Sequence, residues 1–157
     1  MESVPEPAGE EKRADAGTEK GQWSILAVVC VGTFMALLDA FIVNVALPTI
    51  QSTLNANAGE LELVIASYSL TYAVFLITGG RLGDIFGRKK LFVLGMAVFT
   101  IASATCGLAP SPEILIGSRA LQGSGAALMY PQILSIIQVT FSGQKRVAAL
   151  GIFAGVN

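Results

Sequence analysis

Two charged residues, Asp39 and Arg119, lie deep inside segments that are otherwise apolar. Asp39 is the only Asp, Glu, Lys or Arg in residues 24–59, and Arg119 is the only one in residues 114–144. A charge at the centre of a bilayer costs about 2.5–3.5 kcal/mol on insertion scales, so such a residue normally faces a cavity or a partner. A buried carboxyl group suits a site that loads and releases a proton, and a buried guanidinium needs a partner or water. Two alternatives stay open: a neighbouring hydroxyl satisfies Asp39, or the Arg119 side chain extends to the outer surface.

The segments that carry these residues are long enough to cross a membrane as helices. Hydrophobic residues make up 53% of the chain and charged residues 13%, against about 25% charged residues in a soluble domain. Four runs reach the roughly 20 apolar residues that a span needs. Helices are expected because a spanning segment must satisfy its own backbone, and the runs are too uniformly apolar for barrel strands. We predict an all-α membrane protein with a transmembrane bundle over 23–157, its helices at about 24–50, 61–80, 91–109, 113–141 and, incompletely, 147–157.

The fifth apolar run is short. It holds about 11 residues before the sequence ends. At a rise of about 1.5 Å per residue, a helix of this length does not cross a hydrocarbon core of roughly 30 Å. We therefore expect the chain to be a fragment of a longer protein whose C-terminal half is missing.

Basic residues occur on one side of the predicted bundle. Lys and Arg are present in the N-terminal tail, in residues 81–90 and at 145–146, and they are absent from the links after the first and third helices. Because Lys and Arg mark cytoplasmic loops, we predict a plasma-membrane protein with a cytoplasmic N-terminus. Residues 1–22 are rich in Glu, Gly and Pro and poor in large apolar residues, so we predict a disordered cytoplasmic tail.

The composition does not indicate a metal site or a disulfide framework. The chain has no His, and Cys30 and Cys106 lie inside apolar runs. We expect the lipid bilayer as a partner and no nucleic acid.

The Gly79–Lys90 segment (GGRLGDIFGRKK) joins the second and third runs. Its glycines permit sharp turns and close approach of the backbone, and its acidic and basic residues stand about one helical turn apart. A plain alternative is a stop-transfer cluster that only sets the topology. The residues that we expect to carry a role are Gly80, Asp84, Gly87, Arg88 and Lys89.

Polar and small residues accompany both buried charges. On the first helix, Pro48 has no N–H to donate to the carbonyl four residues earlier, which frees an acceptor and permits a kink. On the fourth helix, Gln122 and Gly123 lie on the face of Arg119 at i+3 and i+4, and the small residues that follow permit close helix packing. We predict helix-packing or cavity roles for Asn44, Pro48, Gln122, Gly123 and Ala127.

Further polar groups occur on the second and fourth helices, in residues 68–72 (YSLTY) and at Gln132 and Gln138. These groups line a substrate path or hold helices together. Contact between helices is the commoner role of isolated polar residues in spans.

Three stretches resemble signatures of the major facilitator superfamily. Residues 80–89 (GRLGDIFGRK) resemble its loop between helices 2 and 3, and residues 115–127 (LIGSRALQGSGAA) resemble its helix 4. Residues 38–48 (LDAFIVNVALP) resemble helix 1 of its drug:proton antiporter branch with fourteen spans, although Phe41 stands where that pattern usually has Thr. The resemblance implies the major facilitator fold. It also implies that the loop is a conformational latch and that Arg119 takes part in proton coupling.

The inverted repeats of that superfamily make helices 1 and 4 equivalent, and both line the central cavity. We therefore expect Asp39 and Arg119 to lie together, and we predict that changes in their separation move a proton on and off this region. The resemblance implies efflux of small hydrophobic, drug-like or antibiotic compounds by a protein that is not an enzyme. The proton gradient drives it, without a cofactor. The alternatives are a nutrient uniporter or symporter of the same superfamily, and a non-transporting remnant or accessory membrane protein.

Overall fold

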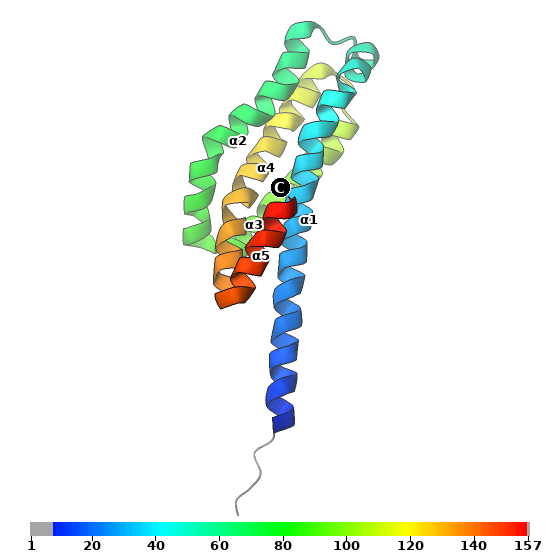
Figure 1. Cartoon of the computed structure of the whole chain (residues 1–157). Helices are drawn as coiled ribbons and strands as arrows, with labels where there is room; N and C mark the ends of the chain where they lie inside the picture. The colour runs from blue at the N-terminus through cyan, green and yellow to red at the C-terminus, as the bar shows by residue number, and fades with distance from the viewer. Residues whose placement is uncertain (1–7, 157) are drawn as a thin grey trace, which may run out of the picture.

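All regular structure is helical in the computed structural model, which describes the backbone of residues 8–156 and the side chains of residues 21–156. The helices are α1 (Ala8–Leu54), α2 (Ala58–Phe86), α3 (Arg88–Gly107), α4 (Pro112–Thr140) and α5 (Gly143–Val156). They lie side by side as a bundle from which α1 projects at one end (Figure 1). The predicted all-α fold is confirmed.

Helix α4 is the centre of the bundle. It packs mainly against α2 and α3, and more sparsely against α1 and α5. Close packing of α3 and α4 depends on glycine, because a Cβ on Gly95 would stand 2.8 Å from the carbonyl oxygen of Gly125. Ala126 and Ala127 are also almost fully buried. The small residues of α4 therefore bring its backbone close to its neighbours.

Within the described part of the chain, three helices are long and apolar enough to span a membrane: residues Gly21–Leu54 of α1, α2 and α3. Helix α4 has 29 residues but is not among them, which differs from the sequence prediction. The reason is that polar residues such as Arg119, Gln122 and Gln132 lower its mean hydropathy; these three side chains are buried inside the bundle. Its surroundings are therefore largely protein. Helix α5 has 14 residues, fewer than the roughly 20 that a span needs.

The link between the second and third helices is shorter than predicted. We predicted helices that end at about residue 80 and begin at about residue 91, but α2 continues to Phe86 and α3 begins at Arg88. Only Gly87 separates them, with φ of 98°, a left-handed conformation that glycine adopts without strain. Hydropathy marks where a helix leaves the membrane, whereas the backbone stays helical until a residue breaks it.

Helix α1 also begins outside its apolar run, because the backbone stays helical beyond the residues that hydropathy marks. The predicted helix starts at residue 24, and the structure carries α1 back to Ala8. The predicted disordered tail covered 1–22, and its residues 1–7 lie outside the described part of the chain. Residues 8–20 are rich in Ala, Glu, Lys and Arg, which have high helix propensity.

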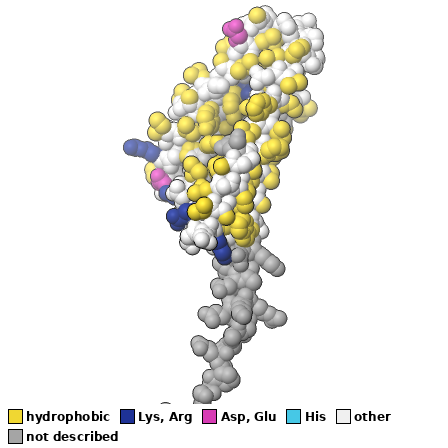
Figure 2. Space-filling model, viewed as in Figure 1, with side chains coloured by type: hydrophobic (Ala, Val, Ile, Leu, Met, Phe, Trp, Pro, Cys, Tyr) yellow, Lys and Arg dark blue, Asp and Glu magenta, His cyan; other side chains and the backbone are white. Residues whose placement is uncertain are grey.

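A capping box starts α2 on the side of the bundle away from the basic links. The backbone N–H of Glu60 donates to Asn57 Oδ1 at 3.0 Å, and the Asn57 N–H donates to Glu60 Oε2 at 2.8 Å. Figure 2 shows hydrophobic side chains over the visible face of the bundle. Most Lys and Arg side chains lie toward the end from which α1 projects. The described basic links therefore lie toward one end of the bundle.

Candidate functional site

Helices α1 and α4 bring the two isolated charges together. Arg119 Nη1 donates to Asp39 Oδ2 at 2.5 Å, and the side chains are 4% and 13% exposed, respectively. The expected pair therefore forms. Both alternatives from the sequence are wrong, because Asp39 is satisfied by a guanidinium and Arg119 does not reach the surface.

Gln122 completes a closed polar triad with these two residues. Its Nε2 donates to Asp39 Oδ1 at 2.7 Å, and its Oε1 accepts from Arg119 Nη1 at 2.7 Å. Each carboxylate oxygen of Asp39 thus receives one donor from α4. Because Gln122 lies one turn after Arg119, the two side chains reach the same carboxylate. In the triad, Arg119 supplies a positive charge beside the Asp39 carboxylate, which is a group that can accept a proton.

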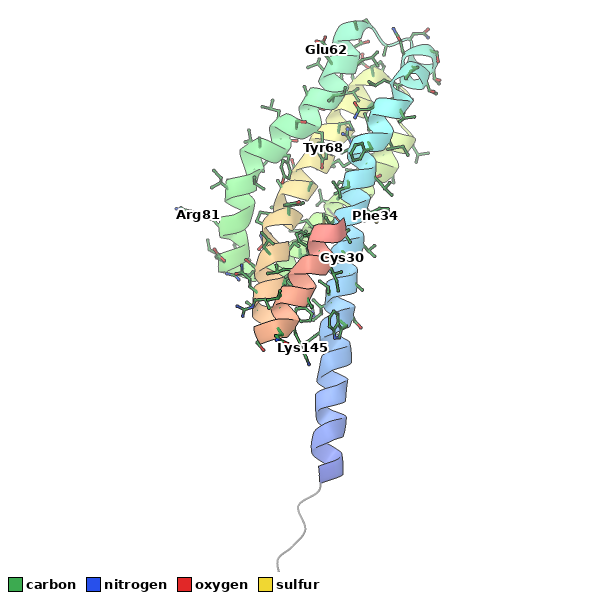
Figure 3. The ribbon with its side chains drawn as sticks, in the orientation of Figure 1. Cys30, Phe34, Glu62, Tyr68, Arg81 and Lys145 are labelled. Atoms are coloured by element: carbon green, nitrogen blue, oxygen red, sulfur yellow. The ribbon has the colours of Figure 1, made fainter. Side chains whose placement is uncertain are left out.

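Three groups from α2 and α3 surround the polar triad. Arg119 Nε donates to the Val64 carbonyl at 3.4 Å, and Arg119 Cζ stands 4.5 Å from the centroid of the Tyr68 ring, within the range of a cation–π contact. The Cys106 thiol lies 3.6 Å from Gln122 Oε1, to which it donates. Tyr68 lies among α1, α2 and α4 (Figure 3).

Sequence reasoning did not place these three groups at the site. The polar run at 68–72 was a signal for Tyr68, but only as a lining or contact residue. No signal in the sequence indicated Val64 or Cys106, because a backbone carbonyl or a thiol reaches the site only through the packing of whole helices.

Asp39 and Arg119 also line a cavity of about 400 Å³ between α1 and the adjoining ends of α3 and α4. Apart from these two, the wall from α1 and α3 is mostly apolar, with a few hydroxyls and the Cys106 thiol. The carboxylate therefore has a route to small molecules or water beside its partners.

The Gly79–Lys90 segment holds a second acid–arginine pair. Asp84 Oδ1 accepts from Arg88 Nη2 at 3.1 Å and from Nε at 3.3 Å, across the break at Gly87. Both side chains are substantially exposed, Arg88 by 39% and Asp84 by 64%. Lys89 lies beside this pair and lines an apolar cavity of about 460 Å³ between α1, α3 and α4.

Gln132 of α4 packs against Gly79 and Gly83, which precede the Asp84–Arg88 pair. Gln132, which is 1% exposed, donates from Nε2 to the Gly79 carbonyl at 2.8 Å. A Cβ on Gly83 would overlap the Gln132 amide, and a Cβ on Gly79 would overlap the carbonyl of Ala127. Pro131 has no N–H to donate to that same carbonyl. Gln132 is thus a polar anchor between α4 and the segment.

The other predicted packing residues divide into two groups. Gly123 and Ala127 contact α2, since a Cβ on Gly123 would overlap the Tyr68 carbonyl. The predicted Gly80 makes only an ordinary contact, 3.6 Å from its Cβ position to Pro131 Cβ. Asn44 and Pro48 do not join the polar triad: the exposed Asn44 amide donates to the Ala40 carbonyl of its own helix at 2.9 Å.

The profile of the Major Facilitator Superfamily matches residues 29–157. Relatives with described roles match over similar lengths. The probable actinorhodin transporter of Streptomyces coelicolor is 42% identical over 132 residues, 84% of this chain. The tetracenomycin C resistance and export protein of Streptomyces glaucescens is 39% identical over 99% of the chain. The multidrug resistance protein Stp of Mycobacterium tuberculosis is 42% identical over 80% of it.

These relatives are much longer than this chain. The matched residues make up 23%, 29% and 24% of the three proteins, respectively. Their names describe transport, resistance and export, which agrees with the prediction that the chain is not an enzyme.

Proposed function

Because this chain belongs to the major facilitator superfamily, we propose that it works as part of a multi-pass transporter that exports hydrophobic, antibiotic-like compounds in exchange for protons. The export roles in the names of its relatives support the direction and the kind of substrate. Since the chain spans about a quarter of their length, the remainder of the cavity comes from segments outside it. We place the protein in the plasma membrane with a cytoplasmic N-terminus, as its basic links predict.

The observation that carries the proton-coupling proposal is the polar triad. Asp39 accepts hydrogen bonds from Arg119 and Gln122 in the structure. When α1 and α4 move apart, the carboxylate loses its counter-charge in apolar surroundings and takes up a proton. When the helices return, Arg119 displaces that proton.

The Gly79–Lys90 segment has a different role in this proposal. Its Asp84–Arg88 pair lies at the surface, at the end of α2 and the start of α3. There, Gly80, Asp84, Gly87, Arg88 and Lys89 form one side of a latch. The other side comes from the second half of the transporter, and the latch holds one access state closed.

Proton-driven efflux tests this function directly. In inverted membrane vesicles that contain the complete gene product, Asp39→Asn and Arg119→Ala are each expected to abolish efflux that depends on a pH gradient. The matched control is Glu62→Gln, which neutralises an exposed acid on α2 and should leave efflux unchanged. Normal efflux by both triad variants would overturn the proton-coupling role. Export from the cell appears in these inverted vesicles as accumulation of the compound inside the vesicle. Transport in the opposite direction would favour the nutrient transporter.

A further inference from the structure

The apolar cavity of about 460 Å³ between α1, α3 and α4 is separate from the polar triad, and neither Asp39 nor Arg119 lines it. Val29 and Phe92 at its base are almost fully buried, whereas Val28 of α1 is 53% exposed and Val93 of α3 is 57% exposed at its sides. Both helices are long and apolar enough to span a membrane. The cavity is therefore a groove that faces lipid, and we call it the α1–α3 groove.

Arg88 and Lys89 give the α1–α3 groove a positive end. Among the described residues that line it, these two alone are charged, and both stand at the start of α3. Asp84 already pairs with Arg88, whereas within residues 21–156 no ion pair includes Lys89. One uncompensated positive charge thus stands at the rim of an apolar groove.

The start of α3 adds backbone donors at the same end. Gly87 is the N-cap residue and supplies no side-chain hydrogen bond, and the first N–H groups of a helix have no acceptor inside that helix. The positive end of the helix dipole also favours an anion. The helix start therefore strengthens the attraction of Lys89 for a negative group.

The position of the groove matches the boundary between headgroups and acyl chains. Ser24, which lines the groove, directly follows Trp23, and Trp is enriched where a span meets the headgroups. From Lys89 to Met96 the groove follows α3 over seven positions, or about 10 Å at a rise of about 1.5 Å per residue. A molecule with an anionic head at the surface and an apolar chain along the span fits both parts.

We propose that the α1–α3 groove binds an anionic phospholipid, with its phosphate against Lys89 and the start of α3 and one acyl chain along the groove. Charge complementarity selects this occupant. After Asp84 has balanced Arg88, the rim carries one positive charge, which matches the single negative charge of phosphatidylglycerol. A zwitterionic lipid brings an ammonium group next to these cations. Lipid binding at this groove does not depend on the proposed export function.

Native mass spectrometry of the complete protein in detergent tests the site with two probes. Dioleoylphosphatidylglycerol and dioleoylphosphatidylcholine carry the same acyl chains and differ in headgroup charge. The first phosphatidylglycerol should bind about three- to tenfold more tightly than the first phosphatidylcholine, because one Lys near an anionic headgroup contributes roughly a factor of five. Equal Kd values for the two lipids would overturn the proposal.

Two neighbouring lysines test the charge. Lys89→Gln removes the cation that lines the groove, and Lys90→Gln removes the next cation along the chain, which does not line it. Lys89→Gln should reduce the affinity for phosphatidylglycerol to that for phosphatidylcholine, whereas Lys90→Gln should keep the preference. Equal losses in the two variants would show a general attraction of the basic surface and would overturn the site.

Two neighbouring apolar residues test the acyl chain. Val93→Trp fills the groove, and Leu94→Trp places the same ring on a residue of α3 that is 52% exposed and does not line it. Val93→Trp should weaken phosphatidylglycerol binding severalfold, and Leu94→Trp should leave it unchanged. All four substituted residues are exposed, so the variants should unfold at the temperature of the unaltered protein.

A water-soluble phosphate separates the headgroup from the whole lipid. Glycerol 3-phosphate has the phosphate without acyl chains and should not displace bound phosphatidylglycerol. Displacement by it would overturn the proposal, because the apolar groove would then contribute nothing. Full affinity in Val93→Trp has the same consequence, and it is the result expected if another helix of the complete transporter covers the groove.

Discussion

The polar triad and the Asp84–Arg88 pair are built from the same two side-chain types, yet they differ in burial and in reach. The triad joins α1 to α4 and is almost closed to solvent, while the Asp84–Arg88 pair joins neighbouring turns and is exposed. Removing one member of a buried pair leaves an uncompensated charge, whereas an exposed pair is weakened by water and salt. Burial, and not the identity of the pair, therefore decides how much stability is lost when one member of the pair is removed.

The largest expected effect tests the buried side of this comparison. Arg119→Leu leaves Asp39 without its counter-charge and should lower the free energy of unfolding by about 3–5 kcal/mol. Thermal unfolding of the complete protein in detergent measures it. The double variant Asp39→Asn with Arg119→Leu should recover part of the loss, because the two residues are coupled. If the losses of the two single variants simply add, the pair is not coupled and the comparison fails.

An intermediate effect is expected where α4 meets the Gly79–Lys90 segment. Gly83→Ala places a methyl group on the Gln132 amide and should destabilise the protein by about 1–3 kcal/mol. Combination with Gln132→Ala should relieve the overlap. Gly117→Ala is the control, since no atom lies within 4 Å of its Cβ position. Equal unfolding temperatures for Gly83→Ala and the control Gly117→Ala would show that Gln132 does not fill the space beside Gly83.

The smallest effect on stability is expected at the exposed pair. Arg88→Ala should cost about 0.2–1 kcal/mol, as for other surface ion pairs, and the cost should shrink at high salt. If the pair is a latch, the same variant lowers the rate of transport although the protein remains folded. Lys90→Ala, which removes an exposed charge nearby, should change neither. Loss of stability as large as that of Arg119→Leu would contradict the contrast between the two regions.

The sequence predicts the parts of this structure that depend on local composition. Long apolar runs predict helices, and an isolated Asp39 and Arg119 in two of them predict a buried pair, because neither charge is tolerated alone. The end of α2 was predicted poorly, since hydropathy falls at Gly80 while the backbone stays helical to Phe86. Outside the membrane, helix ends depend on single residues such as Gly87.

The neighbours of the site depend on distances that no local pattern encodes. Tyr68 contacts Arg119 because α2 and α4 approach closely, which in turn requires the absence of a side chain at Gly123. Gln132 was noted as a polar residue on a span, but its partner is a backbone carbonyl 53 positions earlier. A carbonyl that every residue possesses gives no signal in a sequence.

Helix α4 carries Gln122 and Gln132 ten positions apart, about 15 Å along one helix axis at a rise of about 1.5 Å per residue. The first side chain binds Asp39, and the second binds the backbone just before the exposed ion pair. Where α4 stays straight, a displacement along its axis at one of these two contacts also displaces the other. Pro131, directly before Gln132, lacks a backbone donor and is the natural point for bending. In the function proposed above, bending of α4 at that residue would therefore weaken the link between protonation of Asp39 and movement of the latch.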